Sequence, residues 1–267
     1  MPEGHTLHRL ARLHRRRYVG APVAVTSPQG RFHASTVDGR VLLRAEAHGK
    51  HLFHVYGPDA TVHVHLGLYG TFSEYPHPVV EPVGQVRMRL VGPTHWTDLR
   101  GPTRCEVLTD VEVAALRARL GPDPLRRDAR PDLAFARIAK SRKSIGVLLM
   151  DQDVIAGVGN VYRAEVLFRH GLHPLTPGNK VDRALWDLMW ADLVVLMRHG
   201  VKVGRIDTVR PEHLPAATGR APREDRHGGE VYVYRRTGMP CLVCGTPVAM
   251  ADLAARNLYW CPGCQPE

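Results

Sequence analysis

Hydrophobic residues at helical spacing open the chain. Leu7, Leu10 and Leu13 recur within residues 4–18, with Arg and His between them, so this stretch predicts a helix with one apolar stripe. Beyond residue 20 the pattern changes to short alternating or β-branched runs, at 23–27, 40–47, 50–56, 60–67, 84–92 and 95–101. Gly, Pro and Asp separate these runs. The pattern predicts an antiparallel β-sandwich or barrel over residues 20–115, closed by a helix at 110–120.

The second half of the chain is helical in pattern. Apolar residues recur at helical spacing over 132–140, 144–152, 161–171 and 181–200. The proline-rich segment 121–131 predicts an interdomain linker, and the polar segment 203–230 predicts a mobile loop. We therefore expect an α+β multidomain protein, with an N-terminal β-sandwich domain at 1–120, a helical domain at 121–230 and a small C-terminal domain at 231–267.

Composition and charge narrow the function classes. Hydrophobic residues make up 44% and charged residues 23% of 267 residues, a balance that excludes wholesale disorder. No apolar run approaches the roughly 18 residues of a membrane helix, and the N-terminus lacks the apolar core of a signal peptide. Lys and Arg outnumber Asp and Glu by 36 to 26, for a net charge of +10. This excess favours a polyanion partner, nucleic acid before an anionic membrane.

Four of the five cysteines follow a metal-binding spacing. They are Cys241, Cys244, Cys261 and Cys264, in the order C-x2-C-x16-C-x2-C. Four thiolates complete a tetrahedral shell, so the spacing predicts one structural Zn²⁺ that folds a β-hairpin too short to have its own core. The alternative is a pair of disulfides, which a cytosolic setting disfavours. Cys105 stands apart and is expected to be a small buried apolar side chain.

The chain begins Met-Pro-Glu-Gly, which gives the N-terminus a possible chemistry. Removal of Met1 would expose Pro2 as a secondary amine, whose pKa is about two or more units below that of a lysine. Such an amine can attack a sugar C1′ and form an iminium ion, an electron sink like a Schiff base. Glu3 beside it could move protons. Taken alone, an ordinary terminus is the simpler interpretation.

Residues 144–171 have the pattern of a helix, two tight turns and a second helix. Gly157 and Gly159 lie where the backbone must turn, and Asn160 begins the second helix. A helix N-terminus binds phosphate well, but Asn is also a common N-cap of an ordinary helical hairpin. Local sequence leaves these two interpretations open.

These features, taken together, resemble the formamidopyrimidine-DNA glycosylase and endonuclease VIII family of bifunctional DNA glycosylases. The similarity is carried by the PEG start, a Gly-Lys before a β-strand, GPDPL, the DQ…AGVGN segment and the terminal WCPGCQ. It covers nearly the whole chain. Formamidopyrimidine enzymes usually begin PELPE, so the PEG opening and the short segment before the zinc finger are more similar to the endonuclease VIII branch.

The resemblance implies catalytic roles for four residues. Pro2 would be the nucleophile on C1′, and Glu3 the acid and base for loss of the damaged base. Lys50 matches the β-hairpin lysine that assists base release and β-elimination, and it is one of only five lysines. Arg256 matches the zinc-finger arginine that grips phosphates around the lesion and is linked to δ-elimination.

The resemblance also implies DNA-binding roles. Asn160 would hold a phosphate, and Arg119 falls at a basic DNA-contacting position. Leu68 and Tyr69, in HLGLYG, would fill the gap left by a flipped base, although such residues are more often part of a core or sheet. The three segments become a catalytic domain, a helix–two-turn–helix DNA-binding domain and a zinc finger.

Three departures from the family pattern bear on lesion preference. The chain has Thr6 where the family often has Glu, and His5 where Pro is usual. Gly67 stands in front of Leu68 and Tyr69, where the family commonly has a third bulky or polar residue. The wedge is therefore expected to be smaller, or to be completed by another residue.

The resemblance implies a base-excision-repair DNA glycosylase and AP lyase, which excises oxidised bases, pyrimidines first, through a Pro2 Schiff base and β,δ-elimination. The alternatives are a formamidopyrimidine or 8-oxoguanine glycosylase, a non-catalytic DNA-binding module and a zinc-ribbon regulator. The expected partner is damaged double-stranded DNA, with single-stranded or bubble DNA as further candidates. We expect a monomer without a membrane partner, located in a bacterial-type cytoplasm at the nucleoid.

Overall fold

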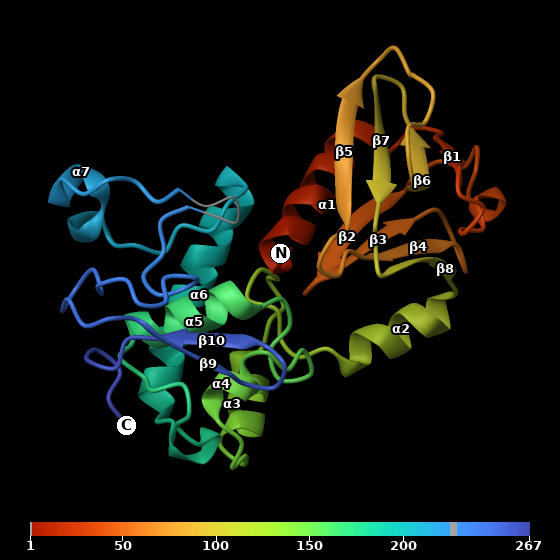
Figure 1. Ribbon diagram of the computed structural model, residues 1–267. Coiled ribbons are helices and arrows are strands. Elements are labelled where there is room, and N and C mark those ends of the chain that lie inside the picture. The colour runs from red at the N-terminus through yellow and green to blue at the C-terminus, as the bar shows by residue number, and fades with distance from the viewer. Residues whose placement is uncertain (1, 225–228) are drawn as a thin grey trace. The chain divides into compact units, whose positions relative to one another are not determined.

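The chain folds into two compact units, residues 1–119 and 120–267. The computed structural model describes residues 2–224 and 229–267 (Figure 1). No helix in these described ranges is long and apolar enough to cross a membrane. The expected α+β fold is confirmed, with a two-sheet unit that carries an N-terminal helix, a helical region and a C-terminal hairpin.

The first unit is a sandwich of two antiparallel four-stranded sheets. One sheet has the order β1-β6-β7-β5, built from β1 (Ala24–Thr26), β5 (Thr71–Pro76), β6 (Val86–Val91) and β7 (His95–Arg100). The other has the order β2-β3-β4-β8, built from β2 (Arg44–His48), β3 (His51–Val55), β4 (Thr61–His65) and β8 (Arg104–Leu108). The predicted runs account for six of these strands, whereas β5 and β8 were not predicted.

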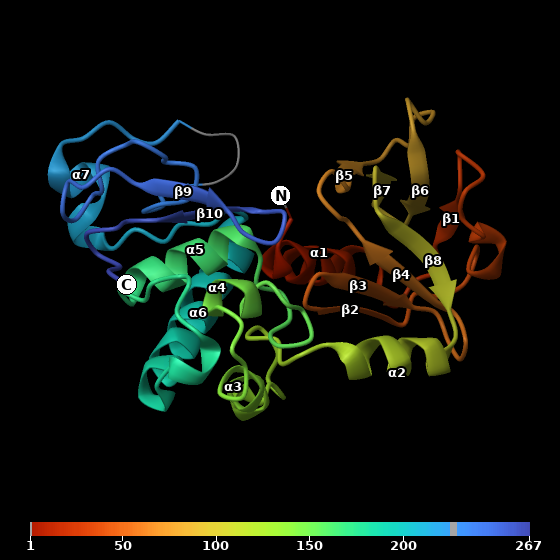
Figure 2. The same ribbon diagram turned by 60° about the horizontal axis from the view of Figure 1, so that its bottom comes forward.

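Helix α1 (Gly4–Tyr18) spans the predicted range and packs on β2 and β3 (Figure 2). Its buried stripe differs from the predicted one, because Leu7, Ala11, His14 and Tyr18 face the core while Leu10 and Leu13 lie at its edge. Cys105 joins the same core as predicted, and burial raises the pKa of its thiol to about 12. A 3-10 turn (Ala34–Thr36) and helix α2 (Asp110–Arg119) complete the unit.

A buried polar network fastens α1 to the first sheet. The carboxylate of Glu74 accepts hydrogen bonds from His14 Nε2 at 2.8 Å, Arg17 at 2.7 Å and the Tyr18 hydroxyl at 2.9 Å. His14 Nδ1 lies 2.9 Å from Nε2 of His54 on β3. Burial, reinforced by His14, lowers the pKa of His54 well below its usual value, so this ring is neutral. Burial alone would raise the pKa of Glu74, but the three donors lower it to about 2.

The second unit is built around helices α5 (Asn160–Arg169) and α6 (Arg183–Val203). It also contains α3 (Pro131–Ile138), α4 (Ile145–Leu148), a 3-10 turn (Gly178–Lys180), a 3-10 turn (Pro211–His213), α7 (Pro215–Thr218), β9 (Ala249–Asp252) and β10 (Asn257–Trp260). Asp182 caps α6 by accepting from two backbone amides, and Gly204 ends it at φ 84°. Trp186 lies fully inside the core, with Trp190 at its edge.

A buried carboxylate ties the later part of this unit to α5. Glu165 is fully buried and accepts from the backbone amides of Tyr232, Val233 and Tyr234 at 2.7–2.9 Å. It also accepts from the hydroxyl of Thr208 at 2.5 Å. Four donors compensate the cost of burying one charge. The predicted mobile loop 203–230 is therefore anchored at both ends; residues 225–228 lie outside the described residues, and its motion stays a prediction.

We expect Glu74→Gln to destabilise the first unit by about 2 kcal/mol at neutral pH, because one charged acceptor serves three donors. The pKa of Glu74 in the folded protein, about 2, is below its ordinary 4.5. Its contribution is therefore present above pH 4.5 and lost as the pH falls towards 2. Urea unfolding, followed by hydrogen exchange of α1 and β5, measures the difference. The exposed Glu81→Gln is the control; a difference that persists undiminished at about pH 2 would contradict this account.

Candidate active site and nucleic-acid interface

The first residues of the chain stand at the positive end of α1. Glu3 is the N-cap residue, with an extended backbone at φ −118° and ψ −178°, and its side chain is fully buried. Its carbonyl accepts from the amide of Thr6 at 2.9 Å. The helix dipole disfavours a cation and favours an anion at this end.

His5, one of the departures from the family pattern, does not add a charge to this end of the helix. Burial, together with the positive charges of Arg9 and the neighbouring His8, lowers the pKa of His5 to about 4. The ring is therefore neutral at physiological pH. The hydroxyl of Thr6 lies 3.4 Å from His5 Nε2, so the two departures contact each other.

A two-residue hairpin presents Lys50. Strands β2 and β3 are paired up to His48 and His51, which leaves Gly49 and Lys50 as the turn. Gly49 has φ +57°, whereas Lys50 has a negative φ, the combination of a type II′ turn that requires Gly first. Lys50 is half-buried, and its positive charge contributes to the lowered pKa of both His51 and His65, after burial. The charge of Lys50 therefore acts on both imidazoles.

The predicted wedge residues project from a loop between β4 and β5. Leu68 is 46% and Tyr69 86% exposed, so they are not core or sheet residues. Gly67 has φ +66°, and a Cβ there would lie 1.9 Å from the hydroxyl of Thr103. A Cβ on Gly70 would lie 2.3 Å from the Leu66 carbonyl. The glycine that was expected to shorten the wedge is therefore required to build the loop that displays it.

Arg119 lies exposed at the last residue of α2. The helix is held to the outer face of the second sheet by Arg117, which pairs with Glu46 at 2.7 Å and lies 4.7 Å over the Phe53 ring. Between this helix and the sheet lies a pocket of about 560 Å³, lined by His51, His63, Arg104, Glu106, Glu112 and Arg119 among others. This pocket could not be predicted from the sequence, because strand β8, which lines it, was not predicted.

The side chain of Gln152 bridges the turns of the helix–two-turn–helix segment. Gln152 donates to the carbonyls of Met150 and Val158 and accepts from the amide of Gly157. Gly157 has φ +94°, as its position predicted. Gly159 is the extended N-cap of α5, and Asn160 is its first residue. The interpretation of Asn160 as the N-cap is therefore wrong.

Asn160 joins α5 to the C-terminal hairpin. Its side-chain amide donates to the carbonyl of Asn257 at 2.9 Å, and its side-chain oxygen accepts from Arg163. Arg163 also reaches the Asn257 carbonyl, at 3.1 Å. The side chain of Asn160 is thus hydrogen-bonded within the protein. Its partner Asn257 directly follows Arg256 in the sequence. These contacts bring two predicted DNA-binding positions, Asn160 and Arg256, into one region.

The four predicted metal ligands converge. The sulfur atoms of Cys241, Cys244, Cys261 and Cys264 all lie within 4.8 Å of one another. Tetrahedral Zn–S bonds of about 2.3 Å would place sulfurs about 3.8 Å apart, and the Cys241–Cys264 separation is 3.8 Å. The donor set therefore fits one Zn²⁺ in a closed shell. Gln265 supports it by accepting from the Cys261 amide and donating to the carbonyl of Leu172 near the end of α5.

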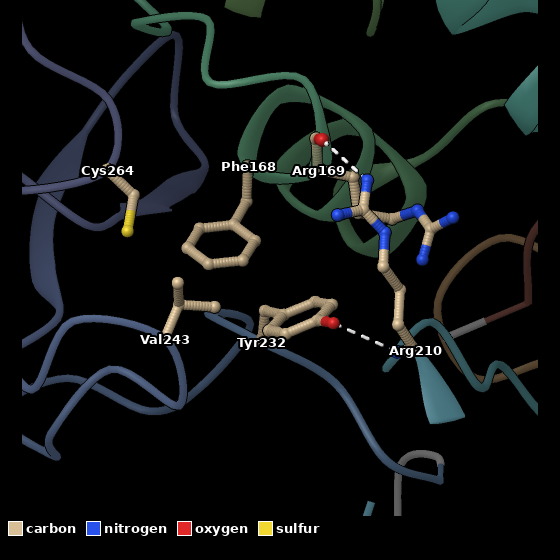
Figure 3. A pocket seen from close by; sticks show the side chains of 6 residues that line it. All are labelled: Phe168, Arg169, Arg210, Tyr232, Val243 and Cys264. Atoms are coloured by element: carbon tan, nitrogen blue, oxygen red, sulfur yellow. Dashed lines mark hydrogen bonds between the residues drawn. The ribbon is translucent and has the colours of Figure 1, made fainter. Parts of the chain in front are cut away.

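A small pocket lies behind this metal centre (Figure 3). Its volume is about 100 Å³, and its lining residues are Phe168, Arg169, Arg210, Tyr232, Val243 and Cys264. Arg210 spans one side, because its guanidinium donates to the Arg169 carbonyl and its amide donates to the Tyr232 hydroxyl. Phe168 and Tyr232 stack with ring centroids 4.5 Å apart. The side chains that line this pocket come from α5 and from the zinc-finger region, so the two pack against each other here.

The hairpin β9–β10 ends in a strained turn beside Arg256. Leu253 and Arg256 exchange two backbone hydrogen bonds, so Ala254 and Ala255 form a two-residue loop. Their φ angles are +52° and +57°, the left-handed pattern of a type I′ turn that Asn-Gly adopts most easily. An alanine in this region costs roughly 1–2 kcal/mol. Arg256 is exposed, and its guanidinium donates to the Ala255 carbonyl at 3.3 Å.

Comparisons with known proteins agree with this architecture. The formamidopyrimidine-DNA glycosylase N-terminal domain matches residues 1–105, its H2TH domain residues 120–211, and a zinc finger found in FPG and IleRS residues 238–266. "Endonuclease 8 1" of Mycobacterium tuberculosis (strain H37Rv) is 59% identical, over 99% of this chain and all of that protein. The chain belongs to the formamidopyrimidine-DNA glycosylase and endonuclease VIII family. The resemblance seen in the sequence is confirmed.

More distant members of the family are also similar. A formamidopyrimidine-DNA glycosylase of Thermosynechococcus vestitus is 30% identical, over 85% of this chain and 80% of its own length. The crystal structure of the MutM (FPG) protein from Thermus thermophilus covers the whole chain, and 99% of its own, with a TM-score of 0.78 at 27% identity. The Lactococcus lactis Fpg in complex with abasic-site DNA has the same fold, with a TM-score of 0.79 at 22% identity, over 99% of this chain and all of its own.

Replacing the two turn alanines by Asn-Gly (A254N/A255G) should stabilise the hairpin by about 1 kcal/mol, because the left-handed turn no longer strains a side chain. Hydrogen exchange of the Arg256 amide, which closes the turn, should slow about fivefold. Ala255→Val is the control in the opposite direction and should speed the exchange, since a β-branched residue disfavours a positive φ angle more than alanine does. Faster exchange in A254N/A255G than in the wild type would show that the turn is not strained.

Proposed function

We propose that this chain is a bifunctional DNA glycosylase and AP lyase of base excision repair that removes oxidised bases from DNA. The observation that carries the proposal is the start of α1, where Pro2 and Glu3 precede the first helical turn in a chain 59% identical along its length to a protein named Endonuclease 8 1. A basic net charge of +10 supports a polyanionic substrate. A DNA substrate also implies a location in the cytoplasm with the nucleoid.

The reaction begins at the N-terminal amine. With Met1 removed, the Pro2 nitrogen attacks C1′ of the damaged nucleotide while the C1′–N bond to the base breaks, and the base takes a proton as it leaves. Lys50 and Glu3 assist these proton transfers. The sugar ring then opens: the Pro2 nitrogen loses its proton and forms a double bond to C1′, while the C1′–O4′ bond breaks and O4′ takes a proton, which gives an iminium ion. The iminium ion acidifies C2′, so loss of a C2′ proton expels the 3′ phosphate, and a second elimination, assisted by Arg256, expels the 5′ phosphate. Water then releases Pro2.

Binding and extrusion of the damaged nucleotide fall to the other predicted residues. Arg119 and Arg256 contact the DNA backbone as exposed cations, and the N-terminus of α5 at Asn160 binds a phosphate. The side chain of Asn160 is also hydrogen-bonded to the Asn257 carbonyl, so it links this helix start to the hairpin that carries Arg256. The Zn²⁺ held by the four cysteines is structural and keeps the hairpin folded.

Oxidised pyrimidines are the proposed lesion class, in keeping with the endonuclease VIII branch. A formamidopyrimidine or 8-oxoguanine substrate is the second candidate, since relatives named formamidopyrimidine-DNA glycosylase are 30–31% identical. Comparison of both lesion classes in duplex, single-stranded and bubble DNA separates these possibilities. We further propose that the protein acts as a monomer.

Borohydride should trap a covalent complex between the mature protein and abasic-site DNA, because it reduces an iminium ion to a stable amine. Peptide mapping should find the adduct on Pro2. A protein that retains Met1 should form none, and Lys180→Gln, which removes an exposed lysine amine, should trap normally. Trapping that survives a retained Met1, or an adduct on another peptide, would overturn the proposed chemistry.

The double variant L68A/Y69A should lose about 10- to 100-fold in excision of a damaged base from duplex DNA, because refilling the vacated stack offsets a few kcal/mol of unstacking. Cleavage of a preformed abasic site, which has no base to extrude, should change less than about threefold. Nicking of the two substrates gives the ratio. Val83→Ala, at an apolar side chain that is 76% exposed, is the control. Equal losses on both substrates would exclude a wedge role.

A further inference from the structure

Imidazoles gather on the outer face of the second sheet, beside Lys50. Cross-strand pairing places His51 opposite His65, His63 opposite Glu106 and His65 opposite Arg104. Because directly paired residues of antiparallel strands share a face, these five side chains lie on the side of the sheet that faces α2. The proposed chemistry uses none of them.

Three of these side chains form a hydrogen-bonded series. Glu106 Oε1 lies 3.0 Å from His63 Nδ1, and His63 Nε2 lies 2.8 Å from His51 Nδ1. A carboxylate only accepts, so His63 carries its proton on Nδ1 and its Nε2 is an acceptor. His51 must then donate from Nδ1, which leaves the Nε2 of His51 without a proton. One carboxylate therefore sets the tautomers of two rings in sequence.

His51 lies next to Lys50 in the chain, at the first position of β3. Burial lowers the pKa of His51 to about 3, with smaller contributions from the imidazoles His63, His65 and His48 and then from the charge of Lys50. Burial is also the main cause of a lowered pKa at His63 and His65. The rings are therefore neutral over the working pH range, and they can orient the ammonium of Lys50 without repelling it.

The remaining charged groups around the series come from two other elements. Arg104 of β8 lies 3.6 Å from the second oxygen of Glu106. On α2, Glu112 and Arg119 line the same pocket of about 560 Å³. Glu112 accepts from the amide and hydroxyl of Thr109, and so it is engaged within its own helix start. Among the described residues, Glu106 is the carboxylate seen hydrogen-bonded to His63.

We propose that Glu106 and His63 are positioning residues that act through His51, whose unprotonated Nε2 accepts a hydrogen bond from the ammonium of Lys50 and aims it at the leaving base. This inference rests on the proposed role of Lys50. A metal site built from the same histidines is the less favoured interpretation, because among the described residues only the four cysteines gather closely enough to be found as a metal-binding group.

The test is Glu106→Gln, which keeps the shape of the side chain but can donate as well as accept. In long-range ¹H–¹⁵N spectra the wild-type protein should show His63 and His51 protonated at Nδ1 only. In E106Q the His51 tautomer should shift towards a protonated Nε2. Excision of the damaged base should fall about tenfold in kcat with KM unchanged, the loss of about one hydrogen bond in the transition state.

Three controls keep the inference separable from the proposed function. Arg104→Gln removes the second partner of Glu106 but keeps the hydrogen bonds that join Glu106, His63 and His51, and it should leave the tautomers and kcat unchanged. Glu106→Asp should recover part of the rate. Borohydride trapping on abasic DNA should persist in E106Q; its absence from the wild type as well would refute the proposed function instead. Three results would overturn the positioning role. They are unchanged His51 and His63 tautomers in E106Q, a loss of kcat in R104Q equal to that in E106Q, and histidine signals that take the expected tautomer pattern only after Zn²⁺ is added.

Discussion

The proposed catalytic amine lies at the end of the chain and can act only if that end is held in place, a requirement that the packing of α1 meets. The helix starts at Gly4, so its first turn fixes Glu3 and restricts Pro2. Its other end is fastened by Glu74, which gathers hydrogen bonds from His14, Arg17 and Tyr18. A flexible terminus would have to be ordered at each turnover, at a cost of roughly 1–2 kcal/mol per residue. The buried network removes that cost in advance.

In each of the two units, side chains with a proposed role in the reaction or in DNA binding follow turns that favour glycine. Gly49 makes the type II′ turn that carries Lys50, and Gly67 fits against Thr103 so that Leu68 and Tyr69 project. Gly157 makes the left-handed turn that leads into α5. In each case the glycine adopts the positive φ angle that the turn requires, and the neighbouring residues carry the side chains with a proposed role. The zinc-finger hairpin is the exception, because two alanines occupy left-handed positions there and the turn is strained instead.

Local patterns predicted helices α1 to α6, six strands, the metal ligands and the turn at Gly157, because each of these depends on residues close in sequence. Helix α7 was not predicted, because it lies in the polar segment 203–230. The strands β5 and β8 were missed, since TFSEYP and RCEVL alternate weakly and are half-exposed. That omission hid the register of β4 with β8, and with it the pairing of His63 with Glu106, which are 43 residues apart. The contact between Asn160 and Asn257, 97 residues apart, was equally invisible. Long-range pairing therefore limited what the sequence could predict about the site.

The strand β3 carries one hydrogen-bonded pair of histidines on each face. The two pairs differ in burial, and this difference limits what each can do. On the inner face His54 meets His14 and ends at Glu74, with both rings fully buried, so no solvent or substrate can reach them. On the outer face His51 meets His63 and ends at Glu106, beside Lys50 and along a pocket. Burying neutral rings is costly unless they are hydrogen-bonded, and each series meets this condition by ending on a carboxylate. The inner series can therefore only hold α1, whereas the outer one has the access and the neighbour that a role in the reaction requires.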